Sequence, residues 1–144
     1  MTARFLALGV VAFALHFVWE MAHAKWYATM NALPFWTATA WCARAALIDV
    51  AISAGAYTAA ALIARSSRWL NELRALPVAI YFAIGLGITI AIERWAIAVG
   101  RWRYEASMPT FGGVGVSPLL QWIVVPLLIA AAARLIMSPR RSPR

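Results

Sequence analysis

The sequence predicts an all-α, polytopic membrane protein, a bundle of four transmembrane helices with its N- and C-termini on the cytoplasmic side. Apolar residues make up 64% of the 144 positions, charged residues only 12%, and the mean hydropathy is +0.75. Soluble domains are about half apolar and about a quarter charged. Four apolar stretches approach the ~20 residues that a helix needs to cross the hydrocarbon core. The basic residues between them are unevenly shared between the two sides, which predicts the orientation.

The expected helices cover the four longest apolar stretches: 5–24, 41–64, 76–99 and 116–137. Segments with Pro, Gly, Asn or clustered Arg separate them and are expected to be loops: 25–40, 65–75 and 100–115. The stretches are rich in Ala and Leu and do not alternate between apolar and polar residues, which argues against a transmembrane β-barrel. Residues 1–137 are therefore expected to form one domain, followed by a basic, disordered tail at 138–144.

The first stretch has a competing interpretation as a signal peptide. Arg4 precedes its apolar run, and Ala22-His23-Ala24 matches the rule of small residues around a cleavage site. Trp19 and Glu20 follow the apolar run, and a bulky and a charged residue at that place favour an uncleaved helix.

The distribution of basic residues predicts a multi-pass protein of the cell inner (plasma) membrane. On the expected cytoplasmic side lie Arg4, Arg65, Arg68, Arg74, Arg134, Arg140, Arg141 and Arg144. On the other side lie Lys25, Arg44, Arg94, Arg101 and Arg103. The larger group is expected to stay inside. Because these residues are scattered between apolar runs, they do not indicate a nucleic-acid-binding surface.

Polar residues gather near the outer end of the expected bundle. Each helix contributes at least one of them at similar depth: Glu20 and His23, then Asp49, Glu93 and Gln121. Seven of the tryptophans are expected at the same end: Trp19, Trp26, Trp36, Trp41, Trp95, Trp102 and Trp122. Charged groups in membrane helices cost a few kcal/mol and usually face the bundle interior. The sequence therefore predicts a polar pocket walled by Trp under the outer surface.

His16, Glu20 and His23 share one face of the first helix because they are spaced four and three residues apart. Two imidazoles and a carboxylate are possible metal ligands, which Asp49 and Glu93 would complete. The alternative is that these groups form only structural hydrogen bonds between helices. The lone Cys42 excludes an intrachain disulfide and a thiolate cluster, and the sequence identifies no cofactor.

The outer arginines offer partners for the three acids, so at least one Arg–carboxylate ion pair is expected there. Ala51, Gly55 and Ala59 on the second helix, and Gly85 with Thr89 on the third, are expected to let helices approach closely. The Gly112-Gly113-x-Gly115 stretch lacks the end of a P-loop, and we interpret it as a flexible loop.

Two blocks of sequence support a resemblance. The first is Trp19-Glu20 with Tyr27, and the second is Gly100-Arg101-Trp102-x-Tyr104 followed by Met108-Pro109, Gly115 and Ser117-Pro118-Leu119-Leu120-Gln121. Together they resemble a group of small bacterial four-helix integral membrane proteins of uncharacterised activity. The resemblance covers most of the chain and implies this fold, but it carries no function or site over. A weaker similarity to sterol-isomerase and sigma-2-like membrane proteins concerns architecture alone.

The leading functional hypothesis is a pocket near the outer leaflet that binds a small amphipathic or lipid-like molecule and can perform acid–base chemistry on it. Glu20 and Glu93 would be the acid–base pair and His23 or His16 the proton shuttle. The expected ligand-binding residues are His16, Trp19, Asp49, Arg101, Trp102, Tyr104 and Gln121, with Arg101 anchoring an anionic headgroup.

The alternative hypothesis is a structural or assembly subunit whose partner is another membrane protein. A proton or ion pathway is disfavoured, because the inner halves of the helices are nearly all apolar apart from Ser53, Tyr57, Thr58 and Thr89.

Overall fold

The computed structural model describes residues 2–66, 69 and 74–137 and is dominated by four long helices. They are α1 (Thr2–His23), α3 (Phe35–Ala64), α4 (Ala75–Ala98) and α5 (Val116–Met137). All four are long and apolar enough to cross a membrane. The all-α fold with four candidate spans is therefore confirmed, and it fits an integral membrane protein. The basic tail at 138–144 lies outside the described residues.

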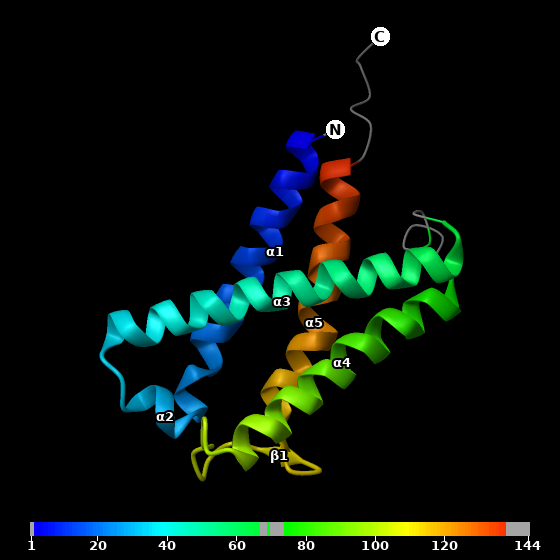
Figure 1. Cartoon of the computed structure of the whole chain (residues 1–144). Coiled ribbons are helices and arrows are strands. Elements are labelled where there is room, and N and C mark those ends of the chain that lie inside the picture. Colours follow the sequence, from blue (N-terminus) through cyan, green and yellow to red (C-terminus); the bar gives the residue numbers. More distant parts are fainter. Residues whose placement is uncertain (1, 67–68, 70–73, 138–144) are drawn as a thin grey trace.

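The helices pack in a ring rather than in parallel rows. α1 contacts both α3 and α5, and α4 contacts the same two helices. In Figure 1, α3 crosses over α1 and α5, whereas the start of α1 and the end of α5 lie at the same end of the molecule. The opposite end of α1 meets the connection to α3 and the connection from α4 to α5.

The second long helix begins at Phe35 and not at Trp41 as the sequence predicted. Pro34 is its N-cap, with φ −57° and ψ 144°, and proline suits the start of a helix because its ring presets φ. The six residues from Phe35 to Ala40 are apolar or Thr, so nothing in them stops the helix. Its other end is capped by Arg65 in the left-handed conformation (φ 49°).

The expected loops contain regular structure. Between α1 and α3 lie a 3-10 turn, η1 (Ala24–Trp26), and a short helix, α2 (Ala28–Asn31). Between α4 and α5 lie two short antiparallel strands, β1 (Thr110–Phe111) and β2 (Val114–Gly115). Gly112 and Gly113 form the turn between the strands, both with positive φ (57° and 78°). The glycine pair is thus a hairpin turn, where glycine adopts positive φ without steric cost, rather than an unstructured loop.

The two connections at this end are tied together by backbone hydrogen bonds. Ala28 N donates to Arg103 O (2.9 Å) and Glu105 N donates to Trp26 O (2.8 Å). These bonds flank an antiparallel bridge between Tyr27 and Tyr104. The pairing places both tyrosine side chains against the end of α4.

Candidate functional site

A cavity of about 710 Å³ lies among the helices and the two connections. Its polar lining comes from α1, α3, α4 and α5 and includes Glu20, His23, Asp49, Glu93 and Gln121. Apolar and aromatic side chains form most of the remaining wall, including Leu33, Ile48, Ile52, Ile92, Trp41, Trp95, Trp102 and Trp122. The predicted convergence of acids from separate helices is thus present in the structure as a lined cavity.

His16 is completely buried beside this cavity and contacts three helices. The Gln121 amide nitrogen lies 3.1 Å from His16 Nδ1 and donates to Asp49 Oδ2 at 2.9 Å. His16 Nδ1 is itself 3.6 Å from Asp49 Oδ2, and His16 Nε2 is 3.4 Å from Ser53 Oγ. One buried imidazole therefore links α1, α3 and α5.

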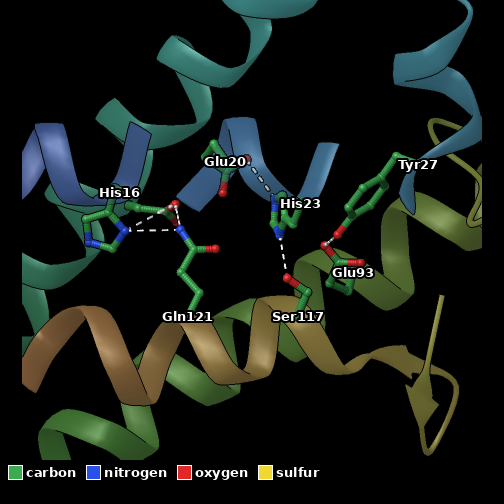
Figure 2. A network of polar contacts seen from close by, with 8 residues as sticks. His16, Glu20, His23, Tyr27, Glu93, Ser117 and Gln121 are labelled. Atoms are coloured by element: carbon green, nitrogen blue, oxygen red, sulfur yellow. Dashed lines mark hydrogen bonds and ion pairs between the residues drawn. The ribbon is translucent and has the colours of Figure 1, made fainter. Parts of the chain in front are cut away.

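His23 forms a second group towards the end of α1. Its Nδ1 lies 3.0 Å from Ser117 Oγ, and its Nε2 lies 3.2 Å from Glu20 Oε2. Figure 2 shows Glu20 between the His16 group and His23. Because a carboxylate accepts only, His23 Nε2–H donates to Glu20 and the Ser117 hydroxyl donates to Nδ1. Sequence reasoning did not identify Ser117 as a site residue, since a serine at the start of a helix is usually a cap.

Glu20 also lies within hydrogen-bonding reach of Asp49. A hydrogen bond between two carboxyl groups requires one of them to hold a proton, since two carboxylates have only acceptors. Side-chain exposures of 14% for Glu20 and 16% for Asp49 limit the water that could stabilise two charges. Glu20 and Asp49 are therefore two neighbouring carboxyl groups in the cavity wall.

Glu93 is 94% buried and is held by two tyrosines, one from the α1–α3 connection and one from the α4–α5 connection. Tyr27 OH donates to Glu93 Oε1 at 3.1 Å, and Tyr104 OH donates to Glu93 Oε2. Gly115 N in turn donates to the Tyr104 hydroxyl at 2.9 Å. Burial raises the pKa of both tyrosines above the ordinary value, and the neighbouring Glu93 raises each further. Both phenols are therefore neutral donors at physiological pH.

The predicted ion pairs between arginine and the acids are absent from the described part of the chain. Its ion pairs join His16 to Asp49 and His23 to Glu20, and none of Arg44, Arg94, Arg101 and Arg103 binds Glu20, Asp49 or Glu93. This prediction was wrong because the guanidinium groups have other partners. Arg44 and Arg101 lie over the ring of Trp41 at 5.7 and 5.6 Å, and Arg94 donates to Gly112 O at 3.1 Å.

The candidate metal ligands do not form a metal centre. Within the described residues, no group of three His, Cys, Asp or Glu side chains is arranged to hold a metal ion. The nitrogens of His16 and His23 are occupied by Gln121, Ser53, Ser117 and Glu20. The i, i+4, i+7 spacing placed His16, Glu20 and His23 on one face, but the rings have separate partners. His16 contacts Ser53 of α3 and Gln121 of α5, whereas His23 contacts Ser117 of α5 and Glu20 of its own helix.

The other predicted site residues have different positions. Arg101 and Trp102 line the cavity, whereas Trp19 and Tyr104 are not in its wall. Tyr104 contacts the cavity lining through its hydrogen bond to Glu93. The indole Nε1–H groups of Trp19 and Trp102 are buried without a hydrogen-bond partner in the described structure. The Trp102 indole N–H lies close to the Glu93 carboxyl group.

No protein-family model, curated protein or solved structure matches the chain.

Proposed function

We propose that this protein binds a small amphipathic or lipid-like molecule in the cavity and transfers protons to or from it. The observation that carries the proposal is the combination of buried acids and apolar wall around one space of about 710 Å³. Pockets for small molecules measure about 300–1,000 Å³, and most of their lining is apolar with a few polar groups. A hydrocarbon chain fits the Ile and Trp wall, and its polar end fits the carboxyl groups.

The acid–base roles follow from the contacts of each group. Glu20 receives a hydrogen bond from His23 and lies beside the carboxyl group of Asp49, and we assign to these two carboxyl groups one proton that they exchange with the ligand. Glu93 is held by two phenols that stabilise its carboxylate. We assign Glu20 and Glu93 as proton acceptors or donors and His23 as the shuttle between Glu20 and Ser117.

Arg101 provides a site for an anionic headgroup. It is exposed, lines the cavity and packs against Trp41 and Trp95 at 5.6 and 6.0 Å. A guanidinium that lies over aromatic rings keeps its N–H groups free to bind a phosphate or carboxylate. In the proposed orientation, with the termini in the cytoplasm, this end of the cavity faces the outer leaflet.

Glutamine variants of the two acids test the proposal. The purified chain in detergent is titrated with n-dodecyl phosphate, and the shift in melting temperature gives the affinity. In the phosphate monoanion present below about pH 6, the P–OH group donates to these carboxyl groups while the charged oxygens face Arg101. We therefore expect Glu20→Gln and Glu93→Gln each to weaken binding at that pH at least about tenfold, which is about 1.4 kcal/mol. Glu105→Gln is the matched control, because Glu105 accepts a hydrogen bond from Asn31 outside the cavity. Equal ligand-induced shifts in all three variants would show that the acids do not contribute.

The second candidate function is a structural or assembly subunit of a larger membrane complex. It is favoured by the position of the small residues of α3, since Ala51 and Gly55 are exposed and a β-carbon at Gly55 would meet nothing within 4 Å. These residues do not join helices of this chain as predicted, so a partner helix could pack there. Purification at native expression level separates the functions: a stable heteromeric complex supports the subunit, and a lone particle with bound lipid supports the binding protein.

A further inference from the structure

The polar network continues beyond the cavity towards the loop between α3 and α4. Ser53 of α3 lies 3.4 Å from His16 Nε2, and its hydroxyl also lies within reach of the Tyr81 phenol of α4. Tyr81 is twelve residues before Glu93, which is roughly 18 Å along the helix axis. His16, Ser53 and Tyr81 are thus polar groups placed next to one another in a region whose sequence is otherwise almost wholly apolar.

The hydrogen-bond pattern assigns the tautomer of His16. Gln121 Nε2 donates to Asp49 Oδ2 at 2.9 Å, so the same amide nitrogen faces His16 Nδ1 as a donor. Nδ1 must therefore accept, and the ring proton is on Nε2. His16 Nε2–H then donates to Ser53, whose hydroxyl is free to donate to Tyr81.

At its far end the chain reaches an aromatic cluster. The Tyr81 ring lies 6.0 Å from the ring of Trp69, and the Tyr57 ring lies 5.3 Å from the same indole. Trp69 is 1% exposed and comes from the connection between α3 and α4. The polar chain therefore ends at Tyr81, in the second turn of α4 and beside Trp69.

At its near end the chain meets the cavity through carboxyl groups. Asp49 and Glu20 line the cavity and share a hydrogen bond, and Asp49 Oδ2 is 3.6 Å from His16 Nδ1. The charged and titratable groups facing His16 are Asp49 from α3 and Glu20 from α1, while α5 contributes Gln121 and Trp122. No basic side chain contacts the imidazole within the described residues, so a proton arriving there meets negative or neutral groups.

We propose that Glu20, Asp49, His16, Ser53 and Tyr81 form a proton relay, which conducts protons between the cavity and the α3–α4 end of the bundle. Each member has both a proton to give and a lone pair to receive one. The relay needs no water-filled pore, so it is compatible with the apolar surroundings.

The first transfer leaves Asp49 as a carboxylate and His16 as an imidazolium, and the later transfers return both to their starting forms. A carboxyl proton moves from Asp49 to His16 Nδ1, after Asp49 approaches to hydrogen-bond distance and the Gln121 amide gives way. The imidazolium releases its Nε2 proton to Ser53, the serine hydroxyl proton passes to Tyr81, and the phenol releases its own proton to water at the α3–α4 end. Reprotonation of Asp49 from Glu20, together with rotation of the hydroxyls and return of the imidazole tautomer, resets the relay. One positive charge crosses per cycle, and no bond other than O–H and N–H is broken.

Proton flux through the whole protein in liposomes tests the relay. The full chain is reconstituted with pyranine inside, and a potassium diffusion potential set with valinomycin drives protons inward. We expect wild-type protein to acidify the lumen faster than empty liposomes, and Tyr81→Phe and Ser53→Ala to lower the protein-dependent rate at least about tenfold. Tyr81→Phe keeps the ring against Trp69, so it tests the hydroxyl alone. His16→Gln should give the same loss if it folds.

Thr58→Ala is the matched control. It also removes a hydroxyl from α3, but Thr58 donates to the backbone oxygen of Ala54 and is exposed. Its flux should equal that of the wild type. Wild-type flux no greater than that of empty liposomes, or full flux in both Tyr81→Phe and Ser53→Ala, would overturn the relay.

The relay rests on the proposed function only for the acids that receive the proton at the cavity. The two proposals fail differently, because Tyr81→Phe and Ser53→Ala lie outside the cavity and should bind n-dodecyl phosphate like wild type. Lost proton flux with intact binding of n-dodecyl phosphate in these variants supports the relay. Proton flux in a wild-type protein that binds no n-dodecyl phosphate would contradict the proposed function and leave the relay standing.

Discussion

Gly85 shows how a single residue controls the packing around the site. A β-carbon at this position would overlap the indole ring of Trp122, which is 1% exposed and lines the cavity. Trp122 also lies 6.2 Å from the His16 ring. The absence of a side chain on α4 therefore lets Trp122 sit between the two helices and support the buried imidazole.

Replacing Gly85 tests this packing at the residue scale. We expect Gly85→Ala to lower the free energy of unfolding by about 1–3 kcal/mol, because a methyl group in a filled core forces side chains out of place. The displaced indole should also reduce binding of n-dodecyl phosphate. Gly87→Ala is the control, since a β-carbon there meets nothing within 4 Å and alanine favours helix by about 1 kcal/mol. Thermal unfolding in detergent measures both, and equal stability of the two variants would contradict the close packing.

At the scale of elements, the α1–α3 and α4–α5 connections are fastened to α4 by two tyrosines, and we call these joined connections the lid. Tyr27 follows η1 and Tyr104 precedes β1, and their rings pack edge to face at 5.4 Å. Both hydroxyls end on Glu93 of α4. The lid therefore depends on phenols that remain protonated.

Alkaline pH should release this lid. In the unfolded chain tyrosine ionises near pH 10, whereas burial raises the pKa of Tyr27 and Tyr104 in the folded protein. Above about pH 10 the folded state thus binds more protons than the unfolded state, and its stability falls as pH rises. We expect the melting temperature to be nearly constant from about pH 8 to 10 and to fall beyond it.

Tyr104→Phe separates this effect from other alkaline changes. The variant should lose about 1–3 kcal/mol at neutral pH, because Glu93 loses a donor. Its further loss of stability above pH 10 should be smaller than that of the wild type, because one tyrosine with a raised pKa has been removed. An identical alkaline slope in the two proteins would rule Tyr104 out as a contributor.

At the scale of the whole molecule, the proposed orientation places the larger group of basic residues in the cytoplasm. These residues lie away from the end of the bundle that holds the cavity. Of the predicted cytoplasmic group, Arg68, Arg140, Arg141 and Arg144 lie outside the described residues, while Arg65 and Arg74 flank the α3–α4 connection. In the proposed topology the relay leads from the outer leaflet towards the cytoplasm.

Cysteine labelling tests this topology. Cys42 is 2% exposed, so the background reaction with a membrane-impermeant maleimide should be low. We expect Ala106→Cys, an exposed position between α4 and α5, to react in intact spheroplasts, and Ser138→Cys to react only after permeabilisation. The reverse pattern would place the cavity on the cytoplasmic side and invert the direction proposed for the relay.

The sequence by itself determined the membrane class and the four long helices. Apolar runs of about twenty residues have few alternatives in lipid, where the backbone must satisfy its own hydrogen bonds. It also predicted that acids from several helices would meet near one end, because charge in a membrane helix must face the interior. Glu20, Asp49 and Glu93 do line one cavity.

Only the tertiary structure decided which groups pair. Spacing placed His16, Glu20 and His23 on one helical face, yet helix crossing turned His16 towards Ser53 and Gln121 and His23 towards Ser117. The same crossing joined Ser53 to Tyr81 and left the arginines against tryptophan rings instead of carboxylates. Periodicity within one helix fixes the direction of a side chain about that axis, but partners across helices depend on rotation, tilt and depth, which no local pattern encodes.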